Sequence, residues 1–451
     1  MTGGSLPSSE LQALVERATA ELERHAVRYP GDPGDRQPAH VVYGGANLFR
    51  RDSARRLGDV AIRVLDEYAP SGAELFEAID PTVDDELADC VHARLREKLE
   101  REPVEDFRID FEDGFGVRTD EEEDATARSA ANETAAGFAD GSLPPFVGIR
   151  IKPLNREWAR RGLRTLDLFV TRLLGVTGGA VPPGFVVTLP KVVSGEQIAA
   201  LASALESLEE RGGLEAGSLR FEIMVETPQS LVAGDGRCPL PGFVETGRGR
   251  LTAAHFGVYD FTASTGITAD YQLMQHPFCD AARQIMRIAL SGTGVMLSDG
   301  ATNLLPVARH RAVPDGPPLS GPQLEENRES VRSAWQLHYD DIRHSLAMGF
   351  YQGWDLHPAQ LVTRYAAVYA FFLESLDAAA DRLTRFVDRA ARATLTGDVF
   401  DDAATGQGLL NFFLRGLSCG ALTEEEVSRT GLSLEELRTR SFSRILEGRA
   451  G

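Results

Sequence analysis

Long apolar segments are missing from this 451-residue sequence. No run reaches the roughly 20 apolar residues that a membrane-spanning helix needs. The first 26 residues also lack the apolar core of a signal peptide, because a polar start leads directly into an amphipathic helical pattern. We therefore expect a cytoplasmic protein with no membrane partner.

Basic residues are too few for a protein that binds polyanions. The chain has 47 Lys and Arg against 67 Asp and Glu, which gives a formal net charge of −20. Nucleic acids and anionic membrane surfaces both require a basic face on the protein. The charge balance therefore argues against nucleic acid as a partner and leaves a small molecule as the expected one.

Cysteine is also scarce, and the four cysteines are far apart with no CxxC pair. This pattern predicts a reducing compartment, no disulfides and no zinc cluster. The nucleotide-binding patterns GxGxxG and GxxxxGK[ST] do not open any predicted helix. Lysine occurs only at Lys98, Lys152 and Lys191, so each lysine near a predicted site is a candidate for a special role.

Short apolar segments, in contrast, recur eight times after residue 39. Segments with helical spacing separate most of them; residues 194–213, for example, carry apolar residues at i, i+3 and i+4 and end on Gly-Gly. Strands alternating with amphipathic helices imply a parallel sheet, and eight such units predict an α/β fold, the closed (β/α)8 TIM barrel. The alternative is an open, doubly wound sheet. The expected strands are 40–45, 107–114, 145–153, 185–192, 220–227, 253–260, 294–300 and 353–358.

The remaining segments suggest additions to the barrel. Residues 1–39 are expected to form a helical leader and a linker rich in Pro and Gly, and residues 40–362 the barrel. Residues 46–106 are too long for one barrel helix and predict two or three, whereas residues 301–325 predict a long loop. Residues 363–451 are expected to form a helical extension that covers the barrel mouth or a neighbouring subunit.

Charged residues close nearly every predicted strand. The catalytic groups of a TIM barrel lie at the carboxyl-terminal ends of its strands, where the loops converge on one cavity. The pattern therefore predicts a shared polar cavity with carboxylates on several walls. In strand order the closing residues are Glu112 and Asp113, Arg150 and Lys152, Lys191, Glu226, Asp260, Asp299 and His357.

Clustered carboxylates repel one another unless a cation lies among them. Oxygen ligands without cysteine, and with little histidine, favour a hard divalent ion, Mg²⁺ or Mn²⁺. Such an ion can hold a carboxylate or a 2-keto acid and stabilise an enolate as a Lewis acid. We expect Arg150 to pair with a substrate carboxylate or enolate oxygen through its planar guanidinium fork.

Several ordered motifs resemble one superfamily. The motifs DFEDGFG, GIRIKPLN, TLPKVVSGEQIAAL, FEIMVETPQSL, HFGVYDFTASTG, GVMLSDG and AMGFYQGWDLHPAQL are similar to those of the HpcH/HpaI aldolase and citrate lyase β-subunit superfamily, between about residues 40 and 362. The resemblance implies a metal-dependent TIM barrel that makes or breaks a carbon–carbon bond through an enolate. It also implies a homo-oligomer, a trimer or a hexamer.

The resemblance assigns roles to five residues. Glu226 of VETP and Asp260 of VYDFTAS match the two Mg²⁺ ligands, and Arg150 of GIRIKP matches the arginine that binds the substrate and its enolate oxygen. Glu112 and Asp113 of FEDG match an acidic pair that holds metal-bound waters. Asp113 lies where some relatives carry a histidine base, which makes it a candidate proton shuttle.

Lys191 follows Leu-Pro, and we expect it to anchor carboxylates and to contribute to substrate binding.

The sequence departs from the family in its first strand, VYGGANLF, in the long span between the first two strands, and in IRIKPLN. The expected activity is a Mg²⁺-dependent carbon–carbon lyase or aldolase that acts on a small carboxylate, a 2-keto acid or an acyl-CoA thioester.

Three alternatives remain open at this point. One is an aldolase that forms a Schiff base through Lys191 or Lys152. The second is a malate-synthase-like condensation of an acyl-CoA with glyoxylate. The third is a catalytically silent barrel that binds a metabolite, although such a barrel has no need of both metal carboxylates.

Overall fold

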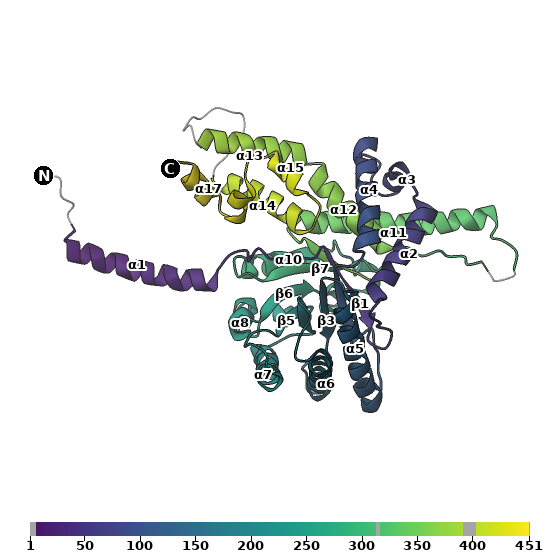
Figure 1. Ribbon diagram of the computed structural model, residues 1–451, viewed down its shortest axis with the longest axis horizontal. Helices are drawn as coiled ribbons and strands as arrows, with labels where there is room; N and C mark the ends of the chain where they lie inside the picture. Colours follow the sequence, from purple (N-terminus) through teal and green to yellow (C-terminus); the bar gives the residue numbers. More distant parts are fainter. Residues whose placement is uncertain (1–5, 313–315, 391–402, 451) are drawn as a thin grey trace.

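The computed structural model describes residues 6–312, 316–390 and 403–450. Eight parallel strands form a closed barrel in sequence order, with β8 pairing back to β1 (Figure 1). The predicted TIM barrel is confirmed, and the open doubly wound sheet is excluded. The strands are His40–Gly45 (β1), Asp106–Asp110 (β2), Phe146–Arg150 (β3), Phe185–Leu189 (β4), Arg220–Val225 (β5), Leu251–Phe256 (β6), Met296–Ala301 (β7) and Gln352–Asp355 (β8).

Helices between the strands cover the outside of the barrel. The helix α5 illustrates the local signals: Thr119 and Glu122 form a capping box at its start, and Gly141 ends it with a φ of 73°, a left-handed conformation that glycine adopts without strain. The covering helices are α5 (Asp120–Asp140), α6 (Ala159–Thr177), α7 (Gly195–Gly212), α8 (Leu240–Thr246), α10 (Pro277–Leu290), α11 (Gly321–Ala347) and α12 (Gln360–Leu373).

The interior of the barrel is strongly charged. Side chains alternate along a strand between its two faces. On β2, Phe107 packs against Phe49, with ring centroids 5.3 Å apart. Arg108, the next residue, points into the barrel. Its Nε donates a hydrogen bond of 2.7 Å to Glu222 Oε1 of β5, on the other side of the barrel. TIM-barrel interiors are usually filled by branched apolar side chains. The charged layers inside this barrel depart from that pattern.

Three helices occupy the segment between β1 and β2: α2 (Ser53–Tyr68), α3 (Gly72–Ile79) and α4 (Asp85–Arg101). They pack on α11 and α12 (Figure 1). Phe76 of α3, for example, meets Tyr339 of α11 edge to face. No described residue between β7 and α11 belongs to a helix or a strand.

The helical tail after α12 lies at the amino-terminal end of the barrel. Ser418 accepts a hydrogen bond from the backbone N–H of Gln37, just before β1, and Arg415 donates one to the Gln37 side chain at 2.9 Å. The expectation that the tail covers the carboxyl-terminal mouth of its own barrel is therefore wrong, because α12 returns the chain to the opposite end. Residues 391–402 of the tail lie outside the described residues. The tail helices are α13 (Leu376–Ala390), α14 (Ala403–Ser418), α15 (Glu424–Ser428), α16 (Leu434–Arg438) and α17 (Phe442–Ala450).

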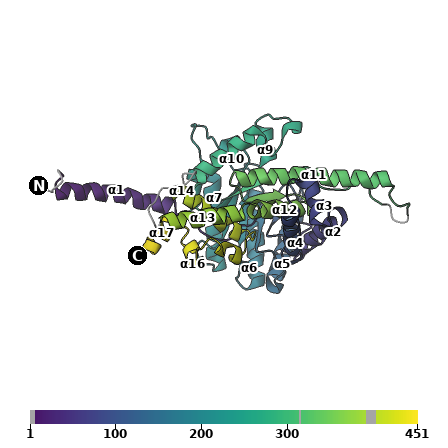
Figure 2. The ribbon, with the colours of Figure 1, turned by 90° about the horizontal axis from the view of Figure 1, so that it is seen from above.

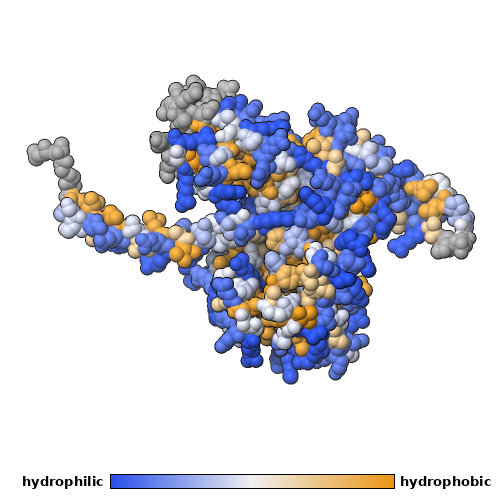
Figure 3. Space-filling view, viewed as in Figure 1, coloured by the Kyte–Doolittle hydropathy of each residue, from blue (hydrophilic) through white to orange (hydrophobic). Residues whose placement is uncertain are grey.

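The leader helix α1 (Ser8–Arg28) projects away from the barrel in both ribbon views (Figures 1 and 2), and none of its residues is buried. Polar and apolar side chains alternate on its surface (Figure 3), and Leu22, for example, is 64% exposed. An ion pair between Arg28 and Glu245 joins its last turn to α8. Among the described helices, none combines the length and the apolar character required to cross a membrane.

Candidate active site

The residues singled out in the sequence gather at the carboxyl-terminal end of the barrel. Glu112 lies just after β2, Lys191 after β4 and Glu226 after β5. Asp260 lies in the first turn of α9 (Val258–Ser264), because β6 ends at Phe256 and not at Asp260 as predicted. A cavity of about 370 Å³ opens here, lined by Glu112, Asp113, Gly116, Val117, Lys152, Pro153, Asn155, Trp158 and Lys191.

Lys191 lies among four carboxylates. Its ammonium Nζ is 2.5 Å from Glu112 Oε1, 3.6 Å from Asp113 Oδ1 and 3.8 Å from Asp260 Oδ2. Its backbone N–H donates a hydrogen bond of 2.6 Å to Glu226 Oε1. Burial would lower the pKa of Lys191, yet the surrounding carboxylates, with Glu112 first, raise it above the ordinary value. The Lys191 side chain is therefore a cation held in place by carboxylates.

The backbone of Lys191 is unusual as well. Its φ is 52°, in the left-handed region that residues other than glycine rarely adopt. Such conformations cost on the order of 1–3 kcal/mol and gather at functional sites. Here the conformation accompanies the hydrogen bond from the Lys191 N–H to Glu226.

Glu226 is a buried carboxyl with too little compensation for its charge. Burial raises its pKa to about 8, and the neighbouring charges of Asp260 and Glu112 contribute to the same shift. Its Oε2 accepts no hydrogen bond from the described part of the chain. A Cβ at Gly257 would lie 2.7 Å from that oxygen, so only glycine leaves the space that Glu226 occupies.

Glu112 is held on one side only. Oε1 accepts from Lys191, whereas the buried Oε2 has no hydrogen-bond partner among the described residues, although Arg150 Nη1 lies 3.1 Å away. Burial raises the pKa of Glu112, and Arg150 and Lys191 oppose that rise. Asp113, the next residue, is 60% exposed at its side chain and faces both cations from the solvent side.

Arg150 is fully buried, and two of its three guanidinium nitrogens are bonded to Asp110. Nε and Nη2 donate to the two oxygens of Asp110 at 2.7 Å and 2.6 Å. The guanidinium also lies over the ring of Tyr43, 4.7 Å from the centroid. Asp110 therefore occupies the Nε and Nη2 side of the guanidinium, and Nη1 is directed to Glu112 and Asp113. Contact between Arg150 and a substrate stays a prediction.

Lys152 has a structural partner. Its ammonium is 2.8 Å from Glu123 and donates a hydrogen bond of 2.7 Å to the backbone oxygen of Phe111. Glu123 belongs to α5, so this buried pair ties the loop after β3 to that helix. Asp299, which lies inside β7 and not at its end as predicted, is likewise bonded to the buried Arg283.

Asp110 and Gly257 are the site residues that the sequence reasoning missed. Asp110 is the last residue of β2, two positions before Glu112, and strand alternation turns both side chains to the barrel interior. That spacing was a usable signal for Asp110. The contact between Gly257 and Glu226 depends on the pairing of β5 with β6 and left no sign in the sequence.

The donor chemistry of the site fits a hard divalent cation. Among the residues that the structure describes, no three His, Cys, Asp or Glu side chains converge on one point. Mg²⁺, however, is commonly held by one or two carboxylates, with waters and substrate completing its shell. The pair Glu226 and Asp260 meets that requirement, and the raised pKa of Glu226 together with the unpartnered Glu112 Oε2 indicates negative charge that a cation would relieve.

Comparison with solved structures finds the same fold in other proteins. A citrate lyase from Burkholderia xenovorans LB400 is 16% identical, covers 88% of this chain and 97% of its own, and has a TM-score of 0.55. A Haloferax volcanii malate synthase is 14% identical, covers 92% and 98%, and has a TM-score of 0.47. CitE from Mycobacterium tuberculosis, in complex with magnesium and acetate, is 16% identical, covers 74% and 91%, and has a TM-score of 0.40. At these identities the first match shows a shared fold alone, and the other two fall below the similarity that supports an argument.

The search of curated proteins found no match. The model of one protein family, in contrast, matches residues 16–445, which is nearly the whole chain. The protein therefore belongs to the family described as a domain of unknown function, DUF6986.

Proposed function

We propose that this protein is a Mg²⁺- or Mn²⁺-dependent carbon–carbon lyase or aldolase of the HpcH/HpaI and citrate-lyase-like type. Its substrate would be a small carboxylate, a 2-keto acid or an acyl-CoA thioester. The fold neighbour with the higher TM-score is named a citrate lyase, which is compatible with this reaction class.

One observation carries the proposal: Glu226 is a fully buried glutamate whose pKa is raised to about 8 beside Asp260 and Glu112. Glu226 has a hydrogen bond from the Lys191 backbone but no cation in direct contact among the described ion pairs. Such a buried carboxylate is costly, and proteins often keep one where chemistry requires it. The cluster lies at the catalytic end of the barrel fold and borders a cavity that two lysines line.

Glu226 and Asp260 would hold the cation, which when bound would supply Lewis-acid stabilisation for an enolate. Lys191 would bind the carboxylate of the substrate, because its ammonium borders the cavity and stays protonated. Arg150 would direct only Nη1 to the developing oxyanion, with Asp110 holding the guanidinium in that orientation. Asp113, the exposed carboxylate of the site, would move the proton.

The Schiff-base alternative has less support. A lysine nucleophile must lose its proton, whereas the carboxylates around Lys191 raise its pKa and Lys152 is paired with Glu123 in a buried position. Condensation of an acyl-CoA remains the second candidate within the same chemistry, since it passes through the same kind of enolate.

Metal binding tests the proposal directly. We expect Mn²⁺ and Mg²⁺ to bind with measurable heat in calorimetry and to raise the melting temperature, because a ligand of the folded state stabilises it. Glu226→Gln and Asp260→Asn should each abolish both effects and leave the circular dichroism spectrum unchanged. Asp299→Asn, a carboxylate in the same barrel that is bonded to Arg283, is the matched control and should keep Mn²⁺ binding. Parent-like metal affinity in both site variants would refute the assignment.

Oxalate mimics the enolate of pyruvate, so it serves as a probe of the substrate site. We expect oxalate to bind only when Mg²⁺ is present and to bind more weakly in Lys191→Met. Borohydride trapping with pyruvate separates the alternatives, because only a Schiff base would be reduced to a stable adduct.

We also propose a homo-oligomer, a trimer or a hexamer, in the cytoplasm. The projecting helix α1 supports association, because an isolated helix is marginally stable in water and this one buries none of its own residues. Light scattering at micromolar concentration tests the proposal, and a monomeric mass would contradict it.

A further inference from the structure

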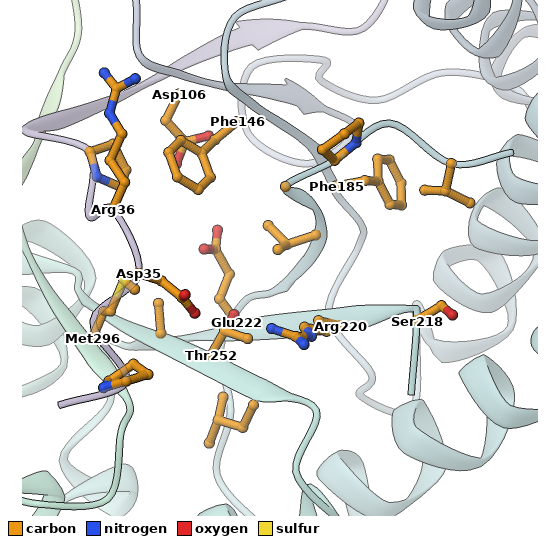
Figure 4. A pocket seen from close by; sticks show the side chains of 18 of the residues that line it. Asp35, Arg36, Asp106, Phe146, Phe185, Ser218, Arg220, Glu222, Thr252 and Met296 are labelled. Atoms are coloured by element: carbon orange, nitrogen blue, oxygen red, sulfur yellow. The ribbon is translucent and has the colours of Figure 1, made fainter. Parts of the chain in front are cut away.

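A second and larger cavity lies at the opposite, amino-terminal end of the barrel. It measures about 870 Å³, within the range of small-molecule sites. Its walls come from the first residues of several strands, among them Asp106 of β2, Phe146 of β3 and Phe185 of β4. Figure 4 shows the carboxylates of Asp106 and Glu222 turned toward the middle of this cavity.

The deep end of the cavity is a buried charged layer of the barrel. Arg108 donates to both oxygens of Glu222, at 2.7 Å and 2.9 Å. Thr188 donates to the same carboxylate, and the His255 ring nitrogen Nε2 lies 2.9 Å from it. Glu222 is therefore fully occupied by partners.

Asp106 is not. Its Oδ1 accepts from Arg108, while its Oδ2 accepts no hydrogen bond from the described residues, although the residue is only 1% exposed. The layer holds two carboxylates and one guanidinium beside the His255 ring, and the guanidinium gives Asp106 a hydrogen bond at Oδ1 alone. Burial raises the pKa of Asp106 to about 6, with Arg108 opposing the rise and Glu222 adding to it.

Much of the remaining wall is apolar or aromatic, and the exposed residues Asp35 and Arg220 add one charge of each sign. Phe146 and Phe185 lie on one side, and the linker between α1 and β1 contributes Pro30, Pro33 and Pro38. The linker is fixed in place, because the Gly31 N–H donates to Gly292 O and Asp32 pairs with Arg415. Arg36, the cation of the linker, is paired with Glu102 and Glu105 and does not neutralise Asp106.

We propose that this cavity binds a small organic cation, with an ammonium group beside Asp106 and an apolar body against Phe146, Phe185 and the linker prolines. An ammonium group supplies the hydrogen-bond donor that Asp106 Oδ2 lacks. Aromatic rings beside a carboxylate favour an organic cation over a hydrated metal ion, since rings attract cations but do not replace water as ligands. The site is independent of the proposed lyase activity.

Three six-carbon probes test the proposal by calorimetry on the full-length protein: hexylammonium, hexanoate and hexanol. We expect hexylammonium to bind at least about tenfold more tightly than either of the others, because a charge-assisted hydrogen bond to a buried carboxylate exceeds a neutral one. Equal affinities for the three probes, or no binding of hexylammonium, would overturn the proposal.

Two variants locate the bound probe. Asp106→Asn keeps the shape and removes the charge, and we expect hexylammonium affinity to fall about tenfold. Ala180→Trp adds bulk at an exposed position on the cavity rim, so it tests the site even if the buried variant does not fold. It should also weaken binding.

Glu226→Gln is the control for the other acidic site, and it should bind hexylammonium as the parent does. Parent-like affinity in Ala180→Trp, or loss of binding in Glu226→Gln, would assign the probe to another site and overturn the proposal.

Discussion

Glu222 lies within β5 and Glu226 directly after it, and both are fully buried, yet their pKa values shift in opposite directions. The pKa of Glu222 is lowered well below its ordinary value, because Arg108 and His255 outweigh the effect of burial. The pKa of Glu226 is raised to about 8, because burial acts together with the charges of Asp260 and Glu112. Burial is the same for both residues, so the partners decide the sign.

The two ends of the barrel differ in the same way. At the amino-terminal end, one arginine saturates Glu222 and leaves a single carboxylate, Asp106, half-bonded. At the carboxyl-terminal end, Arg150 pairs mainly with Asp110, and the remaining carboxylates face only its Nη1 and the ammonium of Lys191 among the described contacts. The first arrangement holds the barrel together, whereas the second keeps a surplus of negative charge that suits cation binding.

Removing Arg108 should have the largest effect. Arg108→Ala leaves Glu222 and Asp106 buried and uncompensated, and loss of one member of a buried ion pair costs about 3–5 kcal/mol. Urea denaturation measures the change. Arg108→Met combined with Glu222→Gln, which removes both charges, should cost clearly less. A loss below about 1 kcal/mol in the single variant would mean that the layer is not structural.

The pH dependence of stability should separate the two glutamates. The folded protein keeps a proton on Glu226 between its unfolded pKa of 4.5 and its folded value of about 8. The free energy of unfolding should therefore fall as pH rises through this window, by on the order of 3 kcal/mol. Glu226→Gln should flatten the profile, measured by urea denaturation from pH 5 to pH 8.

Glu222 contributes with the opposite sign. Because its folded pKa is lowered, its stabilisation is present above the unfolded pKa and disappears as pH falls through the folded value. Glu222→Gln should therefore lose stability at neutral pH and keep the fall in stability that Glu226 causes up to about pH 8. A parent-like slope in Glu226→Gln would disprove the raised pKa.

The two arginines offer a matched pair for function. Arg150→Lys keeps a charge but cannot hold Asp110 bidentately and present Nη1 at once, so we expect oxalate affinity, or kcat once a substrate is known, to fall by about 10². Arg108→Lys makes the same change at the other end and should lower stability without altering oxalate affinity. Equal oxalate affinities in the two variants would remove Arg150 from the active site.

Gly257→Ala should have the smallest effect. The new Cβ would lie 2.5 Å from Glu226 Cβ, so one of the two must move, at a cost of about 1–3 kcal/mol. We expect Mn²⁺ affinity in calorimetry to fall about tenfold, because Glu226 is displaced. At Gly195 a Cβ has no neighbour closer than 3.8 Å, so Gly195→Ala is the control that should change neither quantity. Unchanged Mn²⁺ affinity in Gly257→Ala would contradict the role of Glu226.

The sequence was sufficient for the barrel and for the residues at its carboxyl-terminal end. A short apolar run predicted each strand. Glu112, Lys191 and Glu226 directly follow such runs, which was enough to predict that they share one site. It was not sufficient for the tail, whose helices read the same whichever end of the barrel they cover. The return of α12 to the amino-terminal end, and contacts such as Arg415 with Gln37, decided that point.

What the sequence by itself determined is local: the alternation of apolar and polar residues, the helix caps, and the charged residues that end strands. The partner of each charge was decided only by the closed barrel. Arg150 meets Asp110 because β2 and β3 pair with Asp110 opposite Arg150. Arg108 meets Glu222 because barrel closure brings β2 across from β5. Local patterns depend on neighbours in the chain, whereas the sign of a pKa shift and the saturation of a charge depend on residues more than 30 positions away, which only the tertiary structure brings together.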